Sequence, residues 1–403
     1  MKADNKIYSL HYMRGIACVL VVLFHFRGAV NGVYAQNDLG NLLFLHGAIG
    51  VDLFFMISGF IIAYATQKKE SQLSFLSKRF FRIYPVYITC LLLLFFSTSQ
   101  TFDLNFIKSI FFIHLNYDDH APVYGYTAIF SAWTLTYEIA FYVLFMVAMA
   151  LNHKHRVMLC ILIILVINLT LQTYFNNGEY NLTASTSANY DGPFIGLIKI
   201  YSSPMMLEFA IGLIVFSLHN CLDYLKNINN KYIFNFCISV GFSYVIYCYM
   251  SGYGTFIGPK GYGVISLILF VCVISWEKVY GMKKNKTLEF LGNISYSLYL
   301  THIITHFIFK EYQSTIPLLS TGVGFSKLFI MMSISILLAS VLYVTIEKPF
   351  ILAGRKLLNK NSMKDVTRLL MKNKVFIEMG ILDSPLKLRA VTDLFFIQQH
   401  GGI

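Results

Sequence analysis

Two ionisable side chains, Arg14 and His25, interrupt the first long apolar stretch of the chain, residues 10–26. Their eleven-residue spacing places them about 16 Å apart along an α-helix but only about 20° apart around it. One face of this predicted helix would carry a guanidinium near one membrane surface and an imidazole toward the other. Ionisable groups inside a span are costly and usually face a bundle interior or a polar cavity, so both are functional candidates. The alternative is that Arg14 reaches the lipid headgroups and His25 only caps the far interface.

The paired arginines Arg79 and Arg82 could bind an anion. They are three positions apart and therefore share one face of a helix. Two fork-shaped guanidinium groups at the inner membrane surface suit a phosphate group. The alternative is that they are ordinary basic residues that mark the cytoplasmic side.

Carboxylates occur in two further apolar stretches. Glu138 lies inside the fourth, flanked by Trp133 and Tyr142, and a buried carboxylate there could transfer a proton, orient a histidine or form a structural ion pair. In the second, Asp52 precedes Ser58 by six residues. Asp52 needs a cation or water as partner, and the sequence leaves open which cation that is.

The ninth apolar stretch, NISYSLYLTHIITHF, carries a polar stripe. Ser295, Tyr299 and His302 are spaced by four and three residues, which puts them on one helix face. Such a stripe can simply be interhelical hydrogen bonding. Polar residues in several spans together favour a polar cavity inside the bundle.

The composition indicates a multi-pass membrane protein. Apolar residues make up 56% of the 403 positions and charged residues only 13%, against roughly 25% charged in soluble proteins. The formal net charge of +12 would suit nucleic acid, but basic residues concentrate in loops expected inside, so we expect no nucleic-acid partner. The cysteines show no CxxC spacing and no HExxH motif occurs, so we expect no metal site.

The elements that must position these residues are membrane-spanning helices. Apolar runs of about 17 to 25 residues predict an all-α integral membrane protein, a bundle of about ten transmembrane helices with both termini cytoplasmic. The excess of lysine and arginine in the loops placed inside supports this layout. We expect a membrane domain over residues 1–350 and a basic, amphipathic cytoplasmic tail over residues 351–403. The predicted span centres are Val19, Met56, Leu92, Tyr142, Ile164, Ile211, Val240, Leu269, Leu300 and Leu337.

Taken in order, these motifs resemble the acyltransferase-3 family of integral membrane acyltransferases, in particular bacterial enzymes that O-acetylate exopolysaccharide or lipopolysaccharide. Each matching segment is weak alone, but the ordered set is specific and covers roughly residues 8–350. The segments are YMRGIACVLVVLFHF, GVDLFFMISGFII, RFFRIYPVY, AWTLTYEIAFYVLF, LGNISYSLYLTHI and TIEKPF.

The resemblance implies transfer of an acyl group, most simply acetyl, from cytoplasmic acyl-CoA to a hydroxyl of a cell-surface glycan such as O-antigen or exopolysaccharide. It implies a multi-pass protein of the bacterial inner membrane, with the lipid bilayer, acyl-CoA and the glycan as its partners. It ties His25 most closely to catalysis, with Arg14 beside it in the motif. Arg79 and Arg82 match the basic motif thought to hold the donor, and Glu138 and His302 match recurrent polar positions.

Two mechanisms follow for His25. As a neutral imidazole it could deprotonate the sugar hydroxyl, oriented by Glu138 or Asp52, or it could carry the acyl group as a covalent intermediate. Trp133, Tyr142 or Tyr299 could line the sugar site.

The residues alone are also compatible with two other classes of protein. A transporter or flippase for a glycan precursor would also have polar residues in several spans, although no inverted halves are visible. The other is a sensor or assembly factor that has kept the fold without the activity.

Overall fold

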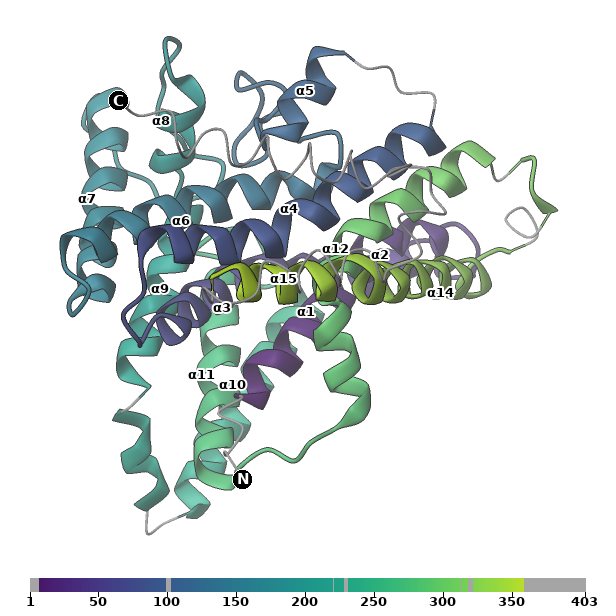
Figure 1. The fold of residues 1–403 in the computed structure, drawn as a ribbon. Coiled ribbons are helices and arrows are strands. Elements are labelled where there is room, and N and C mark those ends of the chain that lie inside the picture. The colour runs from purple at the N-terminus through teal and green to yellow at the C-terminus, as the bar shows by residue number, and fades with distance from the viewer. Residues whose placement is uncertain are drawn as a thin grey trace.

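The structure, a computed structural model, describes residues 7–98, 103–219, 221–227, 231–312, 314–317 and 322–358. This part of the chain is helical and contains no strand (Figure 1). The predicted tail begins at residue 351, which lies within the last described helix, and residues 359–403 lie outside the described part.

Each predicted span centre falls within a helix. These helices are α1 (Tyr8–Phe26), α3 (Ile49–Ala65), α4 (Gln72–Ser97), α6 (Trp133–Leu151), α7 (Arg156–Phe175), α9 (Met205–Leu218), α10 (Lys231–Ser251), α11 (Tyr262–Tyr280), α12 (Lys286–Tyr312) and α14 (Phe325–Leu342). The shorter α-helices are α2 (Leu39–Phe44), α5 (Leu104–Ile110), α8 (Ile195–Ser202) and α15 (Lys348–Leu358).

Within the described residues, eight helical segments are long and apolar enough to cross a membrane. The pair α8 and α9, bent by 49°, makes nine if it forms one span. Helix α12 is not among them, because polar residues are spaced along its length. The structure therefore supports a multi-span helical protein with eight or nine such segments where about ten were expected, and the cytoplasmic location of the termini stays a prediction.

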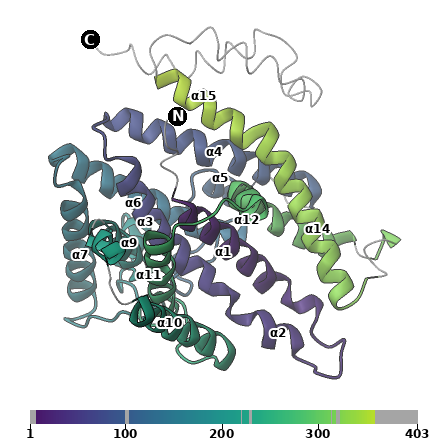
Figure 2. The ribbon, with the colours of Figure 1, turned by 90° about the horizontal axis from the view of Figure 1, so that it is seen from below.

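Helix α1 lies near the centre of the bundle, against α3 and α12 (Figure 2). Its contact with α12 is close because two glycines meet there: a Cβ atom added to Gly15 would lie 2.8 Å from the backbone nitrogen of Gly292. Small residues of this kind let helix backbones approach each other in membranes. The close contact fixes the face of α1 that carries Arg14 against α12.

The start of α1 is fixed by a carboxylate from another helix. Glu277 of α11 accepts hydrogen bonds from the backbone N–H groups of Tyr8 (2.9 Å) and Ser9 (3.1 Å) and from the Ser9 hydroxyl. The first N–H groups of a helix have no intrahelical partner, and negative charge stabilises that end. Because α1 is one continuous helix, this cap also fixes the height of Arg14 in the bundle.

The last two helices form one long rod, joined by a π-helical turn at Tyr343–Glu347 (Figure 1). The Glu347 carboxylate accepts a hydrogen bond from Ser297 of α12 at 2.6 Å. Helix α15 then packs closely on α4, where a Cβ added to Gly354 would lie 2.8 Å from that of Phe81. Together these contacts hold α15 against the helix that carries Arg79 and Arg82.

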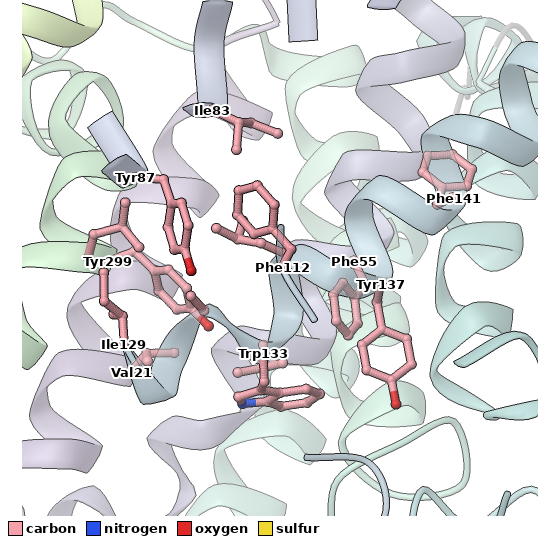
Figure 3. Packing of buried hydrophobic residues seen from close by; sticks show 14 of the residues in the cluster. Val21, Phe55, Ile83, Tyr87, Phe112, Ile129, Trp133, Tyr137, Phe141 and Tyr299 are labelled. Carbon is pink, nitrogen blue, oxygen red and sulfur yellow. The ribbon is translucent and has the colours of Figure 1, made fainter. Parts of the chain in front are cut away.

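The largest apolar cluster is rich in aromatic rings and joins α1, α3, α4, α6 and α12. Figure 3 shows part of it, with Phe55 near Trp133 and Tyr137. Their ring centroids lie 6.4 Å and 6.1 Å from that of Phe55, in edge-on and tilted arrangements, which are favourable geometries for aromatic pairs. This packing forms the rigid support of the polar cavity described next.

Candidate active site

A cavity of about 720 Å³ lies between α1, α3, α4, α6, α12 and α15. Its mouth is marked by Lys78, whose side chain is 37% exposed. Its deep end includes Thr134 and Tyr299, which are both buried. Cations outnumber anions in its walls: the basic side chains are Arg14, Lys78, Arg79, Arg82 and Arg355, and the acidic ones are Glu70 and Glu138.

The arginines predicted from two separate motifs therefore line one cavity. The Nη2 atom of Arg14 donates to the Ser295 hydroxyl of α12 at 3.1 Å. The guanidinium carbon of Arg79 lies 4.7 Å from the centre of the Phe75 ring, and its buried Nε has no hydrogen-bond partner among the described residues. An unsatisfied buried donor is costly, so Arg79 is suited to an anionic ligand that supplies the missing acceptor.

Glu138 holds α3 and α6 together at the cavity wall. It accepts a hydrogen bond from the Ser58 hydroxyl at 3.1 Å and another from the hydroxyl of Tyr142. Ser58 and Tyr142 also line the cavity. In this arrangement Glu138 is bonded to hydroxyl groups and is not the partner of His25, although we expected that it or Asp52 would orient the imidazole.

The histidine that contacts His25 is His302. Its Nε2 lies 3.0 Å from Nδ1 of His25, and its own Nδ1 lies 3.1 Å from the carbonyl oxygen of Leu298. A carbonyl oxygen can only accept, so Nδ1 of His302 carries the hydrogen. When both rings are neutral, Nε2 of His302 accepts from Nδ1–H of His25, which leaves Nε2 of His25 with a free lone pair. The network therefore assigns the tautomer in which His25 can act as a base.

The two histidines lie behind the deep end of the cavity and do not line it. The Tyr299 ring, which does line it, has its centroid 5.9 Å from that of His302. His25 also contacts Phe130, with ring centroids 5.1 Å apart. The site therefore has two parts, a basic cavity and a histidine pair, with Tyr299 between them.

Asp52 lies outside this arrangement. Among the described residues, it forms no hydrogen bond with Arg14 or His25. Its Oδ1 accepts from the backbone N–H of Gly258 at 2.8 Å. Its Oδ2 is buried without a hydrogen-bond partner among the described residues, as are both carboxyl oxygens of Glu208 on α9. The observed partner of Asp52 is therefore a backbone N–H group and not a cation.

Trp133 also lies outside the cavity lining. Its ring packs against Tyr137 at a centroid distance of 5.7 Å, and its carbonyl oxygen lies 3.2 Å from Nε2 of His114. Of the aromatic residues proposed for a sugar site, Tyr142 and Tyr299 line the basic cavity and Trp133 supports it from behind.

Sequence reasoning missed several residues of the site. Lys78 and Arg355 belong to the basic residues of the segments expected inside, and both line the cavity. Glu70 forms an ion pair with Lys78 and belongs to no motif of the sequence. Only the position of Lys78 next to Arg79 could have suggested its role. Within the described residues, no group of three or more His, Cys, Asp and Glu side chains is placed to hold a metal ion.

Fold and cavity together define a multi-pass helical membrane protein with a basic internal cavity. The family model for the acyltransferase domain (Acyl_transf_3) matches residues 7–344. The chain therefore belongs to this acyltransferase family.

Individual relatives are distant. The chain is 25% identical over 401 residues to SAR0937 of Staphylococcus aureus strain MRSA252, whose name gives O-acetyltransferase as a provisional activity; the match covers 90% of this chain and 61% of that protein. It is 25% identical over 331 residues to the exopolysaccharide production protein ExoZ of Rhizobium meliloti strain 1021, covering 77% and 92%.

A shorter match, 27% identical over 154 residues, relates the chain to the acyltransferase MdmB of Streptomyces mycarofaciens, covering 35% and 38%. The chain thus spans less than two thirds of the length of MdmB and SAR0937. No solved structure shows significant similarity to it.

Proposed function

We propose that this protein is a membrane O-acyltransferase that moves an acyl group, most simply acetyl, from acyl-CoA to a hydroxyl group of a cell-surface glycan. The observation that carries the proposal is the pairing of a basic cavity with a histidine pair directly behind its deep end. Membership of the acyltransferase family favours this function over a transporter or flippase. The names of SAR0937 and ExoZ support an acetyl group and a polysaccharide acceptor, such as exopolysaccharide or O-antigen.

The donor site is the basic cavity. CoA carries several phosphate groups, and the cations near the mouth, Lys78, Arg79 and Arg82, can pair with them. Arg355 of α15 adds a guanidinium from another helix. The thin pantetheine arm would then extend past Arg14 toward Thr134 and Tyr299, bringing the thioester to the deep end. Because acyl-CoA is made in the cytoplasm, the mouth of the cavity would face that side of the inner membrane.

The acceptor hydroxyl would approach from the opposite surface. Nε2 of His25, which carries the free lone pair, takes the hydroxyl proton while the hydroxyl oxygen attacks the thioester carbonyl carbon. The carbon–sulfur bond breaks, and the proton on His25 passes to the departing thiolate, so that the ester and free CoA leave. In this scheme His302 is a positioning residue and His25 the catalytic one.

A covalent route uses the same atoms. Nε2 of His25 attacks the thioester carbonyl and the thiolate leaves, which gives an acyl-imidazolium. The glycan hydroxyl then attacks the acyl carbon, its proton passes to the thiolate, and Nε2 of His25 is regenerated. Both routes require a free Nε2 on His25.

The test is the acylation state of the surface polysaccharide in four strains: gene intact, gene deleted, His25→Ala and His155→Ala. His155 is an exposed residue before α7 and serves as the control histidine. Mass spectrometry and proton NMR should show an acetyl mass increment and methyl signal in the intact and His155→Ala strains only. If the His25→Ala strain still acetylates its polysaccharide, His25 is not the catalytic residue. Acetylation that is equal in the intact and deleted strains would contradict the proposed acceptor.

A further inference from the structure

The basic cavity ends before it reaches the histidine pair. Thr134 and Tyr299 belong to its lining, whereas His25 and His302 do not. Tyr299 precedes His302 by three residues on α12, and the centroids of the two rings are 5.9 Å apart. Among the residues that line the cavity, Tyr299 therefore connects its deep end to the histidine pair.

Tyr299 is fixed in this position by hydrogen bonds to a segment distant in sequence. Its hydroxyl donates to the carbonyl oxygen of Ser131 at 2.8 Å and lies 2.9 Å from Oγ1 of Thr134. The Ser131 hydroxyl in turn donates to the backbone carbonyl of Tyr299 at 3.1 Å. On the cavity side the Phe54 ring meets the Tyr299 ring edge-on, at a centroid distance of 5.8 Å. The ring is thus held across the gap between α12 and the start of α6.

We propose that Tyr299 is a gate between the donor cavity and the histidine pair and that it sets the length of the acyl group transferred. This proposal rests on the proposed function and deepens it. Moving the ring aside breaks the hydrogen bonds that its hydroxyl makes to Ser131 and Thr134. These bonds orient the ring, and the bulk of the ring itself sets the size of the opening.

The size of the opening would decide which acyl groups pass. An acetyl group ends in one methyl, whereas a butyryl group carries two further methylenes that need more room beside the aromatic wall of Phe54 and Tyr299. Enzyme pockets discriminate roughly 10- to 200-fold for one methylene. A wild-type gate of this kind selects acetyl, and shortening the side chain at position 299 removes the selection.

A matched control lies one turn earlier on the same helix. Tyr296 also lines the cavity, and its hydroxyl donates to the carbonyl oxygen of Ile83 on α4 at 2.8 Å. It has the same side chain and one carbonyl partner, but this bond directs it toward α4 and not toward the start of α6. A general loosening of the cavity would affect both tyrosines alike, whereas a gate concerns Tyr299 alone.

The experiment uses membranes from the deletion strain, which contain the native acceptor, with the full-length protein supplied as wild type, Tyr299→Ala, Tyr299→Leu, Tyr299→Phe or Tyr296→Ala. Acetyl-CoA, propionyl-CoA and butyryl-CoA are added in turn, and acyl groups on the polysaccharide are measured by mass spectrometry. The readout is the ratio of kcat/KM for butyryl-CoA to that for acetyl-CoA. A ratio is insensitive to the amount of folded protein.

We expect Tyr299→Ala to raise this ratio about tenfold or more, Tyr299→Leu to lie between, and Tyr299→Phe, which keeps the ring, to restore the wild-type ratio. Tyr296→Ala should leave the ratio unchanged. Three results would contradict the gate proposal. The ratio could stay unchanged in Tyr299→Ala and Tyr299→Leu, or it could rise equally in Tyr296→Ala. Alternatively, Tyr299→Ala and Tyr299→Leu could lose all transfer although both proteins are present at wild-type abundance. Failure of the wild type to transfer any of the three acyl groups would instead contradict the proposed function.

Discussion

The contact between His25 and His302 joins residues 277 positions apart and determines which nitrogen of His25 is free. The carbonyl oxygen of Leu298 fixes the hydrogen on His302, and His302 fixes the hydrogen on His25. Without His302, both tautomers of His25 become available, and the ring loses its orientation. His302 thus acts through His25 and need not touch the substrate.

We expect His302→Ala to lower kcat about 100-fold while changing the KM for acyl-CoA little, because general-base catalysis contributes about 10²–10⁴ and the donor cavity is untouched. His302→Gln should recover part of the loss, since its amide oxygen can accept from Nδ1–H of His25. Initial-rate measurements on purified protein separate kcat from KM. A wild-type kcat in His302→Ala would rule out the positioning role.

At the mouth of the cavity, Glu70 neutralises Lys78, a cation that would otherwise be free to pair with a phosphate group of the donor. It is ion-paired with Lys78 and accepts a hydrogen bond from the Ser74 hydroxyl at 3.2 Å. A bound donor must therefore compete with a carboxylate for Lys78.

Substitution of Glu70 and Arg82 should move the donor affinity in opposite directions. Glu70→Gln frees Lys78 and should lower the KM for acyl-CoA up to about fivefold, since a partly exposed ion pair contributes at most about 1 kcal/mol. Arg82→Gln should raise it. Glu289→Gln, at an ion pair with Lys284 outside the cavity lining, is the control. Shifts in the same direction for Glu70→Gln and Arg82→Gln would show that net charge at the mouth does not govern donor binding.

At the scale of elements, α3 and α9 approach each other through two glycines. A Cβ added to Gly212 would lie 2.0 Å from the carbonyl oxygen of Met56, and one added to Gly59 would lie 2.3 Å from that of Phe209. Backbone atoms cannot move aside as a flexible side chain can. This contact holds α3, which contributes Ser58 to the cavity, at a fixed distance from α9.

Gly212→Ala should therefore lower the thermal stability in detergent, with a loss of about 1–3 kcal/mol as for other overpacked interiors. Gly28→Ala is the matched control, because a Cβ added there meets no atom within 4 Å. Thermal unfolding followed by circular dichroism measures both. Equal melting temperatures for Gly212→Ala and wild type would mean that the two helices can separate without cost.

The elements themselves were largely predictable from sequence, whereas their pairing was not. Apolar length placed each span centre in a helix, because a membrane imposes a minimum length on any helix that crosses it. The partner of His25 lies on α12 and that of Asp52 is Gly258, before α11. The spacing of residues within one helix carries no information on which segment it faces. Lys78 and Arg355 looked like topology signals, since the same cations serve both roles.

At the scale of the whole molecule, cavity and histidine pair lie at different depths of the bundle. The mouth lies where α3 ends and α4 begins, and His25 lies near the far end of α1. If the start of α1 is cytoplasmic, as the loop charges predict, the donor enters from inside and the acceptor from outside.

This orientation can be measured with single cysteines in a background where the exposed Cys221 and Cys237 are replaced by serine. Asn37→Cys and Gln72→Cys introduce exposed thiols at the two ends of the bundle. A membrane-impermeant maleimide added to intact cells should label Asn37→Cys only and should label Gln72→Cys after the cells are opened. The reverse pattern would place the cavity mouth outside, away from the cytoplasmic acyl-CoA pool.

The closed floor of the cavity at Tyr299 also has an electrical consequence. A water-filled cavity carries the potential of the compartment to which it opens, so the membrane voltage would fall mainly across the segment between Tyr299 and the opposite surface. In acyl transfer the proton moves from oxygen to sulfur while the acyl group moves the other way, so the completed reaction carries no net charge through this field. A proton that binds Nε2 of His25 from the opposite surface does cross part of the field, and each elementary charge moved through all of it gains or loses about 2.3 kcal/mol per 100 mV. The membrane voltage would then act on the fraction of molecules in which Nε2 of His25 is free.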